Sequence, residues 1–140
     1  MMKFKAIIVL FFPIILSSCL DSQVNSMKLD KAKSLLNERP DSSLAIIRSI
    51  DTLSLGSKAT KAKYSLLHAI ALDKNYIDTT DINVVLPAVN YYIRRGSAEE
   101  RFKSYYYLGR IQYNAGNFND AVISYSKAED MNPLCSSIAF

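Results

Sequence analysis

The sequence predicts an all-α protein built from antiparallel helical hairpins. From Lys28 onward the apolar residues recur every three or four positions, which is the spacing of one face of an amphipathic helix. Only four glycines and four prolines interrupt the 140 residues, so few breaks separate the periodic stretches. A chain of this length has room for one modest domain, and its apolar and charged content is that of a globular protein.

The first eighteen residues predict a bacterial lipoprotein signal peptide. Two lysines precede an apolar run of eleven residues, Ala6 to Leu16, whereas a membrane-spanning helix needs about 20. The run ends in Leu16-Ser17-Ser18-Cys19, which resembles the lipobox of bacterial lipoproteins. The resemblance implies that residues 1–18 are removed and that Cys19 carries acyl chains such as palmitate. An ordinary secreted protein and an uncleaved anchor are the alternatives.

Loss of the signal peptide changes the charge balance. The basic residues fall from 17 to 15 against 13 acidic ones, so the net charge falls from +4 to +2. We therefore expect no nucleic-acid binding. A lipidated Cys19 would leave Cys135 without an internal disulfide partner. Residues 19–27 are polar and lack helical periodicity, which predicts a lipidated tether. They contain no acidic cluster, which favours the periplasmic face of an outer membrane.

Three helices are expected in the first half of the mature chain. The first begins near Lys28 and ends at Arg39-Pro40, since the residue before proline is disfavoured in a helix. Asp41 or Ser42 can cap the second, and the third covers Lys58 to Asn75. The apolar faces of the three helices comprise, in order, Leu29, Ala32, Leu35 and Leu36; Leu44, Ile47 and Ile50; and Ala62, Leu66, Ala69 and Ile70.

Three more helices are expected in the second half. One spans Asp81 to Arg95, but Pro87 lies inside it, so this helix either kinks there or begins near Leu86. Ser97 and Glu100 have the spacing of a capping box, which opens a helix running to about Ala115. Gly116-Asn117 then turns the chain into a last helix from Asn119 to Met131.

Residues 102–135 carry the clearest internal motif. Over this 34-residue stretch the chain resembles a tetratricopeptide repeat. The matching positions follow the repeat's aromatic-x-x-Leu-Gly opening, its small-residue second helix and its closing proline: Tyr105, Leu108, Gly109, Ala121, Tyr125, Ala128 and Pro133. Gly109 and Ala121 are expected where the two helices cross most closely. Gln112 departs from the pattern, since the family prefers tyrosine there.

The upstream hairpins resemble the repeat less well. Ala88 and Tyr92 repeat the Ala121 and Tyr125 pair 33 residues earlier, and Ser43 and Ile47 repeat it again. The resemblance implies that residues 28–140 form about three hairpins stacked as a short right-handed superhelix. As a whole, the architecture resembles lipid-anchored tetratricopeptide proteins of the Gram-negative envelope. Some longer relatives of this type resemble sensors.

The family resemblance implies a protein-binding groove along the first helix of each hairpin. In the clearest repeat, the residues expected opposite the helix–helix seam are Lys103, Tyr106, Arg110, Tyr113 and Asn114. Tyrosine and arginine are common interface anchors, so this face should suit an extended peptide or a partner helix. The alternative is that these residues are simply solvated.

No pattern in the sequence predicts catalysis, a metal or a cofactor. His68 is the only histidine and has no nearby cysteine or acidic partner, so we expect a structural role. Glu99 and Glu100 are better explained by helix capping than by acid–base chemistry. We therefore expect no enzyme activity.

The C-terminal end is expected to expose an apolar patch over Ala121, Tyr125 and Ala128, because no further repeat covers the last helix. Either a longer protein supplies that cover, or a partner or second copy does. The leading functional hypothesis is thus an envelope scaffold for protein–protein interaction, with a sensor fragment as one form of it. The alternatives are a lipoprotein that captures a solute or glycan and an outer-membrane assembly factor.

Overall fold

The structure is a computed structural model that describes residues 23–131. The predicted signal peptide and Cys19 lie outside the described residues, as do Pro133, Cys135 and the last residues of the chain. Nothing in the structure therefore bears on these parts of the prediction.

The described residues form helices and contain no strand, which confirms the all-α class. An N-terminal helix occupies residues 23–35. It is followed by α2 (Pro40–Arg48), α3 (Lys58–Lys74), α4 (Leu86–Arg95), α5 (Ala98–Asn114) and α6 (Phe118–Asp130). Two short 3-10 helices, η1 (Thr52–Ser54) and η2 (Ile82–Val84), lie in the connections before α3 and α4. Among residues 23–131, no helix is long and apolar enough to cross a membrane.

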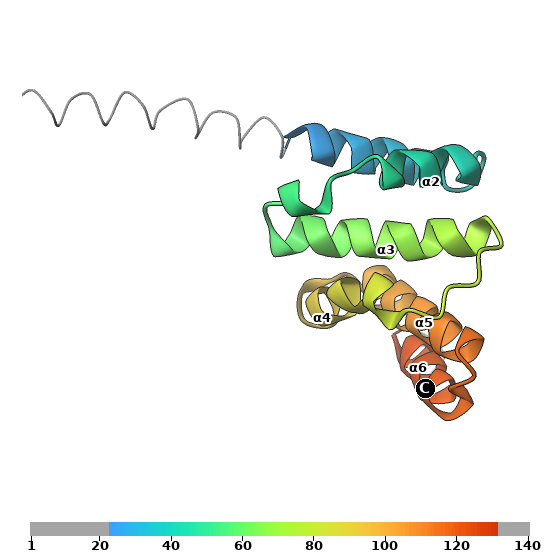
Figure 1. Cartoon of the computed structure of the whole chain (residues 1–140). Coiled ribbons are helices and arrows are strands. Elements are labelled where there is room, and N and C mark those ends of the chain that lie inside the picture. The colour runs from blue at the N-terminus through green and yellow to red at the C-terminus, as the bar shows by residue number, and fades with distance from the viewer. Residues whose placement is uncertain (1–22, 132–140) are drawn as a thin grey trace, which may run out of the picture.

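The helices follow one another as three antiparallel pairs (Figure 1). The N-terminal helix pairs with α2, α3 pairs with α4, and α5 pairs with α6. Contacts between pairs join α2 to α3, α4 to α5, and α3 to α5. The first helices of the second and third pairs, α3 and α5, thus touch each other, and α4 touches both of them.

The N-terminal helix begins earlier than predicted. Residues 23–27 are helical, so the expected tether over 19–27 is wrong for that part of the range. The polar residues there did not indicate solvent exposure, because Asn25 is buried and its amide donates to Ser54 Oγ at 2.7 Å. This bond attaches the start of the helix to η1.

Proline sets the starts of two helices. Pro40 occupies the first turn of α2, and its cap residue is Arg39 at φ −140°, rather than the predicted Asp41 or Ser42. Proline suits this position because the first helical N–H groups have no partner within the helix. Pro87 likewise lies in the first turn of α4. The later of the two predicted starts for this helix, near Leu86, is therefore confirmed.

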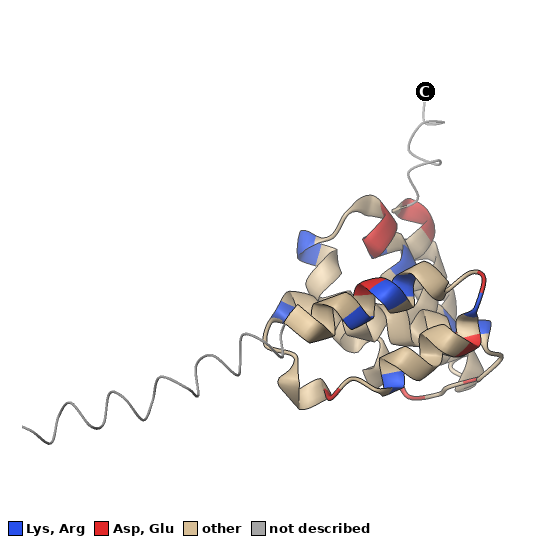
Figure 2. Ribbon diagram, turned by 90° about the horizontal axis from the view of Figure 1, so that it is seen from above, with Lys and Arg blue, Asp and Glu red and all other residues tan. Residues whose placement is uncertain are grey.

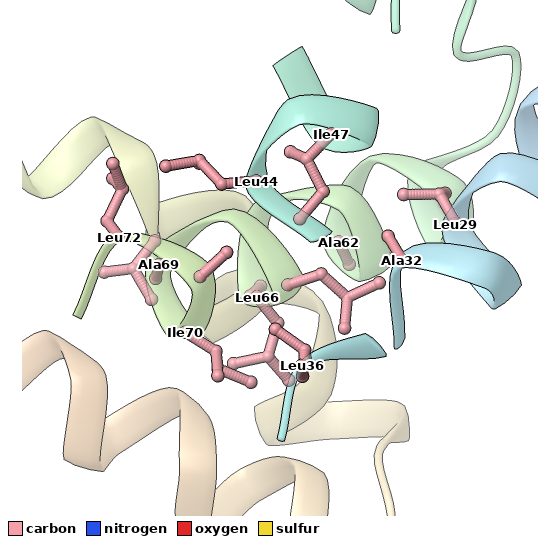
Figure 3. Packing of buried hydrophobic residues seen from close by; sticks show 14 of the residues in the cluster. Leu29, Ala32, Leu36, Leu44, Ile47, Ala62, Leu66, Ala69, Ile70 and Leu72 are labelled. Atoms are coloured by element: carbon pink, nitrogen blue, oxygen red, sulfur yellow. The ribbon is translucent and has the colours of Figure 1, made fainter. Parts of the chain in front are cut away.

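The boundaries of α3, α5 and α6 agree with the predicted ones to within one or two residues, whereas the N-terminal helix ends at residue 35, before the predicted Arg39. The Ser97 capping box of α5 is complete: Glu100 N–H donates to Ser97 Oγ at 3.2 Å, and Ser97 N–H donates to Glu100 Oε2 at 2.8 Å. The core lies mainly between the first three helices and α4 (Figure 3). The predicted apolar faces supply most of it, although Leu35 is only partly buried.

Candidate protein-binding surface

The seam between α5 and α6 is built from small residues and one tyrosine ring. Ala121 and Ala128 are 1% and 2% exposed, and α6 packs against α5. A Cβ atom placed on Gly109 would lie 2.7 Å from Cε1 of Tyr125, which is closer than real Cβ contacts allow. Gly109 therefore lacks a side chain where the ring of Tyr125 crosses α5.

The seam also explains the departure at Gln112. Ser124 is buried in α6, and its hydroxyl donates to Gln112 Oε1 at 2.6 Å. A glutamine with a serine opposite it thus replaces the aromatic contact of the family pattern by a hydrogen bond. Beside it, Tyr105 and Leu108 are partly buried against the main core, and the Nζ of Lys127 lies 5.6 Å from the Tyr105 ring centroid.

Two of the five predicted groove residues form hydrogen bonds to the preceding hairpin. Arg110 donates from Nε and Nη2 to Asp73 Oδ1 at 2.9 and 2.7 Å, which ties α5 to α3. Asn114 donates to the carbonyl of Thr79 at 3.3 Å. Both side chains are thus bonded to the preceding hairpin and remain partly exposed, so their place in a binding groove stays a prediction. The sequence could not show these bonds, because each partner lies 35 or more residues away.

Tyr106 and Tyr113 are exposed, but neither lies opposite the seam. Tyr106 is 37% exposed, and its ring lies 5.8 Å from that of Tyr125 of α6 and stacks on the Phe102 ring at 6.0 Å. Tyr113 is 53% exposed and meets Phe118 edge-on at 5.3 Å. These tyrosines flank the seam and the turn that follows α5. Burial, together with Asp73, raises the pKa of the neighbouring Tyr107 to about 12.

A concave surface does exist, and it crosses the first helices of all three hairpins. We call it the three-helix groove. It has a volume of about 340 Å³ and lies between the N-terminal helix, α3 and the start of α5. Its apolar floor and charged rim are formed chiefly by Leu36, Leu66, Leu67 and Ile70, and by Lys33, Lys63, Glu99, Glu100 and Lys103. Of the five predicted groove residues, Lys103 lines it.

The charges on the rim are partly paired with one another. Lys63 Nζ lies 2.6 Å from Asp30 Oδ1, and Lys103 pairs with Glu99 one turn earlier in α5. Hydrogen bonding to Lys63 lowers the pKa of Asp30, and hydrogen bonding to Lys103 lowers the pKa of Glu99. Lys33 forms no salt bridge with any described residue. Among the described residues, the rim therefore has one lysine without a salt bridge, Lys33, and two lysines in exposed ion pairs that a charged partner could replace.

Sequence reasoning missed the contributions of the N-terminal helix and α3 to this groove. Lys33 and Leu36 lie on the same helix side by their spacing of three, and Lys63 and Leu66 repeat that pattern in α3. This Lys-x-x-Leu spacing was a signal that could have suggested a shared face. It became decisive only once the hairpins were placed against each other.

The remaining candidates play no part in the groove. His68 is partly buried with its ring 5.6 Å from Tyr64, and burial lowers its pKa from the ordinary 6.5. Within residues 23–131 no three His, Cys, Asp or Glu side chains are arranged to hold a metal ion.

The predicted apolar patch over Ala121, Tyr125 and Ala128 is wrong. The two alanines are buried and Tyr125 is partly buried, because these residues face α5. The exposed apolar residues of α6 are Phe118, Val122 and Ile123, which lie on another side of the same helix.

No family model, curated protein or solved structure matches this chain.

Proposed function

We propose that this chain is a lipid-anchored scaffold of the tetratricopeptide type that binds a segment of another protein in the three-helix groove. The single observation that carries the proposal is this groove, to which the first helix of every hairpin contributes. Arrays of helical hairpins present such extended concave surfaces to their partners.

The packing of the hairpins supports a tetratricopeptide-like arrangement. Three helix pairs follow in series, and α3 touches both α4, its partner, and α5, the first helix of the next pair. Asp73 and Arg110 bond α3 directly to α5. The close approach at Gly109, with Ala121 and Ala128 in the same seam, has the features that the 102–135 resemblance implies.

The chemistry of the groove favours a peptide or a helix as its occupant. An apolar floor of leucine and isoleucine can accept one or two apolar side chains, and the rim presents charges of both signs. Lys33 has no partner among the described residues, so it favours a segment with an acidic residue at that end. Such a surface provides recognition through a few anchor side chains.

The anchor is part of the same proposal, on the strength of Leu16-Ser17-Ser18-Cys19 after an apolar run. Several acyl chains on one cysteine give a stable attachment, whereas one chain gives a marginal one. Placement on the periplasmic side of an outer membrane follows from the lack of an acidic cluster after Cys19.

Cross-linking in cells tests the binding function. A photoreactive residue at Lys33, and separately at Lys103, should capture the same protein partner, because both positions border the groove. The control is the same probe at Leu53, which is exposed on η1 and outside the groove. Capture of no protein from either groove position, or of the same proteins from Leu53, would count against the scaffold and favour the solute-binding alternative.

Fractionation tests the anchor separately. The protein should appear in the membrane fraction with a mass that includes acyl chains, and Cys19→Ser should remove both properties. A Cys135→Ser variant is the matched control, since it removes the other cysteine. Membrane attachment that survives Cys19→Ser without a change of mass would contradict a lipid anchor on this residue.

A further inference from the structure

A second hollow, away from the groove, is lined by basic residues. We call it the basic cleft. It lies between the start of α3 and one face of α4 and has a volume of about 350 Å³. Its lining consists of Lys58, Lys61, Pro87, Asn90, Tyr91, Arg94 and Arg95.

The cleft has four cations and no carboxylate in its lining. Lys58, Lys61, Arg94 and Arg95 form no salt bridge with any residue from 23 to 131, whereas two of the lysines beside the groove are paired. Basic and acidic residues are otherwise interspersed over the helices (Figure 2). Four like charges around one hollow repel each other, so they favour an anion between them.

Two of these cations lie where a helix disfavours them. Lys58 and Lys61 are in the first turn of α3, which contains no acidic residue. The N-terminal end of a helix carries partial positive charge, so lysine there is unfavourable for stability. Helix stability therefore does not account for these lysines, whereas an anion bound between them would offset their cost.

The other lining groups match phosphate, and Tyr91 favours a phosphate ester over the bare ion. Arg94 and Arg95 can donate paired N–H groups to phosphate oxygens, and Asn90 adds an amide donor. The guanidinium of Arg95 lies 5.9 Å from the ring centroid of Tyr91. Tyrosine has an apolar body and a polar tip, which suits the boundary between a headgroup and its glycerol.

The basic cleft lies at the end of the domain where the N-terminal helix begins. Tyr91 and Arg95 also line a neighbouring hollow of about 320 Å³ together with Ser26 and Leu29. Figure 1 shows the first described turn of the N-terminal helix, the start of α3 and α4 at one end of the stack. Cys19 precedes Ser26 by seven positions. Seven residues reach at most about 25 Å, so an anchored Cys19 would keep the cleft close to the bilayer.

We propose that the basic cleft binds the phosphate headgroup of an anionic phospholipid in the membrane that holds the anchor. This inference rests on the lipid anchor of the proposed function. Binding of the headgroup would fix the orientation of the domain on the membrane, since the acyl chains alone allow it to rotate about the tether.

Tryptophan fluorescence in vesicles provides the test. The chain contains no tryptophan, so Tyr91→Trp places a single reporter in the cleft. Tyr76→Trp is the matched reporter, because Tyr76 is 94% exposed just beyond the other end of α3. The full lipidated chain is inserted into vesicles of phosphatidylcholine with or without phosphatidylglycerol, both containing a lipid with a spin-labelled headgroup. Flotation measures attachment, and quenching measures contact with headgroups.

We expect strong quenching of the Tyr91→Trp reporter in the phosphatidylglycerol vesicles and weak quenching in phosphatidylcholine alone. Each basic residue near an anionic surface strengthens contact about fivefold, so Lys58→Gln with Arg94→Gln should weaken it by about 25-fold. Arg39→Gln with Lys74→Gln removes the same charge from exposed positions outside the cleft and should leave the quenching unchanged. Circular dichroism confirms that all variants fold.

Four results would overturn the inference. Equal quenching in the two vesicles, with the protein attached to both, refutes the cleft and leaves the anchor intact. Equal loss of quenching in the two charge variants shows an effect of net charge rather than a site. A response of the reporter to soluble glycerol phosphate, without extra quenching in anionic vesicles, assigns the cleft to a soluble phosphate ester. Failure to float with either vesicle refutes the anchor of the proposed function, and this inference with it.

Discussion

Two regions of the domain are held together in different ways. One consists of the first hairpin and α3, and the other is the last hairpin, formed by α5 and α6. Leucine and isoleucine side chains fill the space between the N-terminal helix, α2 and α3, and they form most of the main core cluster (Figure 3). No residue of α6, all of which is described, belongs to that cluster. Its buried residues are Ala121, Ser124 and Ala128.

The hairpin whose sequence resembles a known repeat is therefore not the one with the largest hydrophobic core. The last hairpin carries the motif that resembles a known repeat, yet its only buried hydrophobic residues are Ile111 and two alanines, Ala121 and Ala128. The first hairpin resembles the repeat poorly because many large apolar residues can fill a core, whereas a close helix crossing accepts only small ones. We therefore expect α6 to open at a lower free energy than the helices around α3.

Removing a core side chain should have the largest effect. Ile47 is fully buried between α2 and its neighbours, so Ile47→Ala should lower the free energy of unfolding by about 2–5 kcal/mol. Chemical denaturation followed by circular dichroism measures the change. The matched control is Ile123→Ala on the exposed side of α6, which should cost far less. Similar losses at the two positions would contradict the comparison between the hairpins.

A bulky residue at Gly109 should damage the last hairpin selectively. Gly109→Leu must displace the Tyr125 ring, at a cost of about 1–3 kcal/mol for overpacking. Hydrogen exchange should show faster opening of α6 while α3 stays protected. Gly56→Leu is the control, because a Cβ there meets no atom within 4 Å. If Gly109→Leu left the stability and the exchange of α6 at the parent values, the stacking interpretation at this seam would be wrong.

Breaking the Asp73–Arg110 pair should have a smaller effect. Both side chains are about one-third exposed, so solvent screens the pair, and Asp73→Asn should cost no more than about 1 kcal/mol. A double-mutant cycle with Arg110→Gln isolates the coupling between α3 and α5. A coupling of zero would show that this ion pair does not help to hold the two hairpins together.

The smallest effect expected is a pH dependence centred on His68. Burial, and then the charge of Arg48, lowers the pKa of His68 below the 6.5 of the unfolded chain. The unfolded state therefore binds the proton first as the pH falls. The free energy of unfolding should decrease as the pH falls from 6.5 to the lowered pKa of His68 in the folded protein. Hydrogen bonding to lysine lowers the pKa values of Asp30 and Glu99 below their ordinary 3.8 and 4.5, so these carboxyl groups do not titrate near pH 6.5.

Thermal melts at neutral and at mildly acidic pH measure this pH dependence of stability. The variant His68→Gln should flatten the profile over the same range, since it removes the only histidine of the chain. A profile that stayed as steep in the variant would show that another group titrates there.

The sequence alone determined what local interactions decide. Apolar spacing identified six helices, Ser97 and Glu100 marked the start of α5, and Gly109 indicated a close contact, because each of these effects acts within a turn or a hairpin. Only the tertiary structure decided which exposed side chains share a surface. In the sequence, Arg110 and Asn114 have no evident hydrogen-bond partner, whereas the fold places Asp73 and Thr79, which are far away in the chain, beside them. Lys33 and Lys103 line one groove for the same reason: the packing angles of helices decide which distant residues share a surface, and hydrophobic periodicity does not specify these angles.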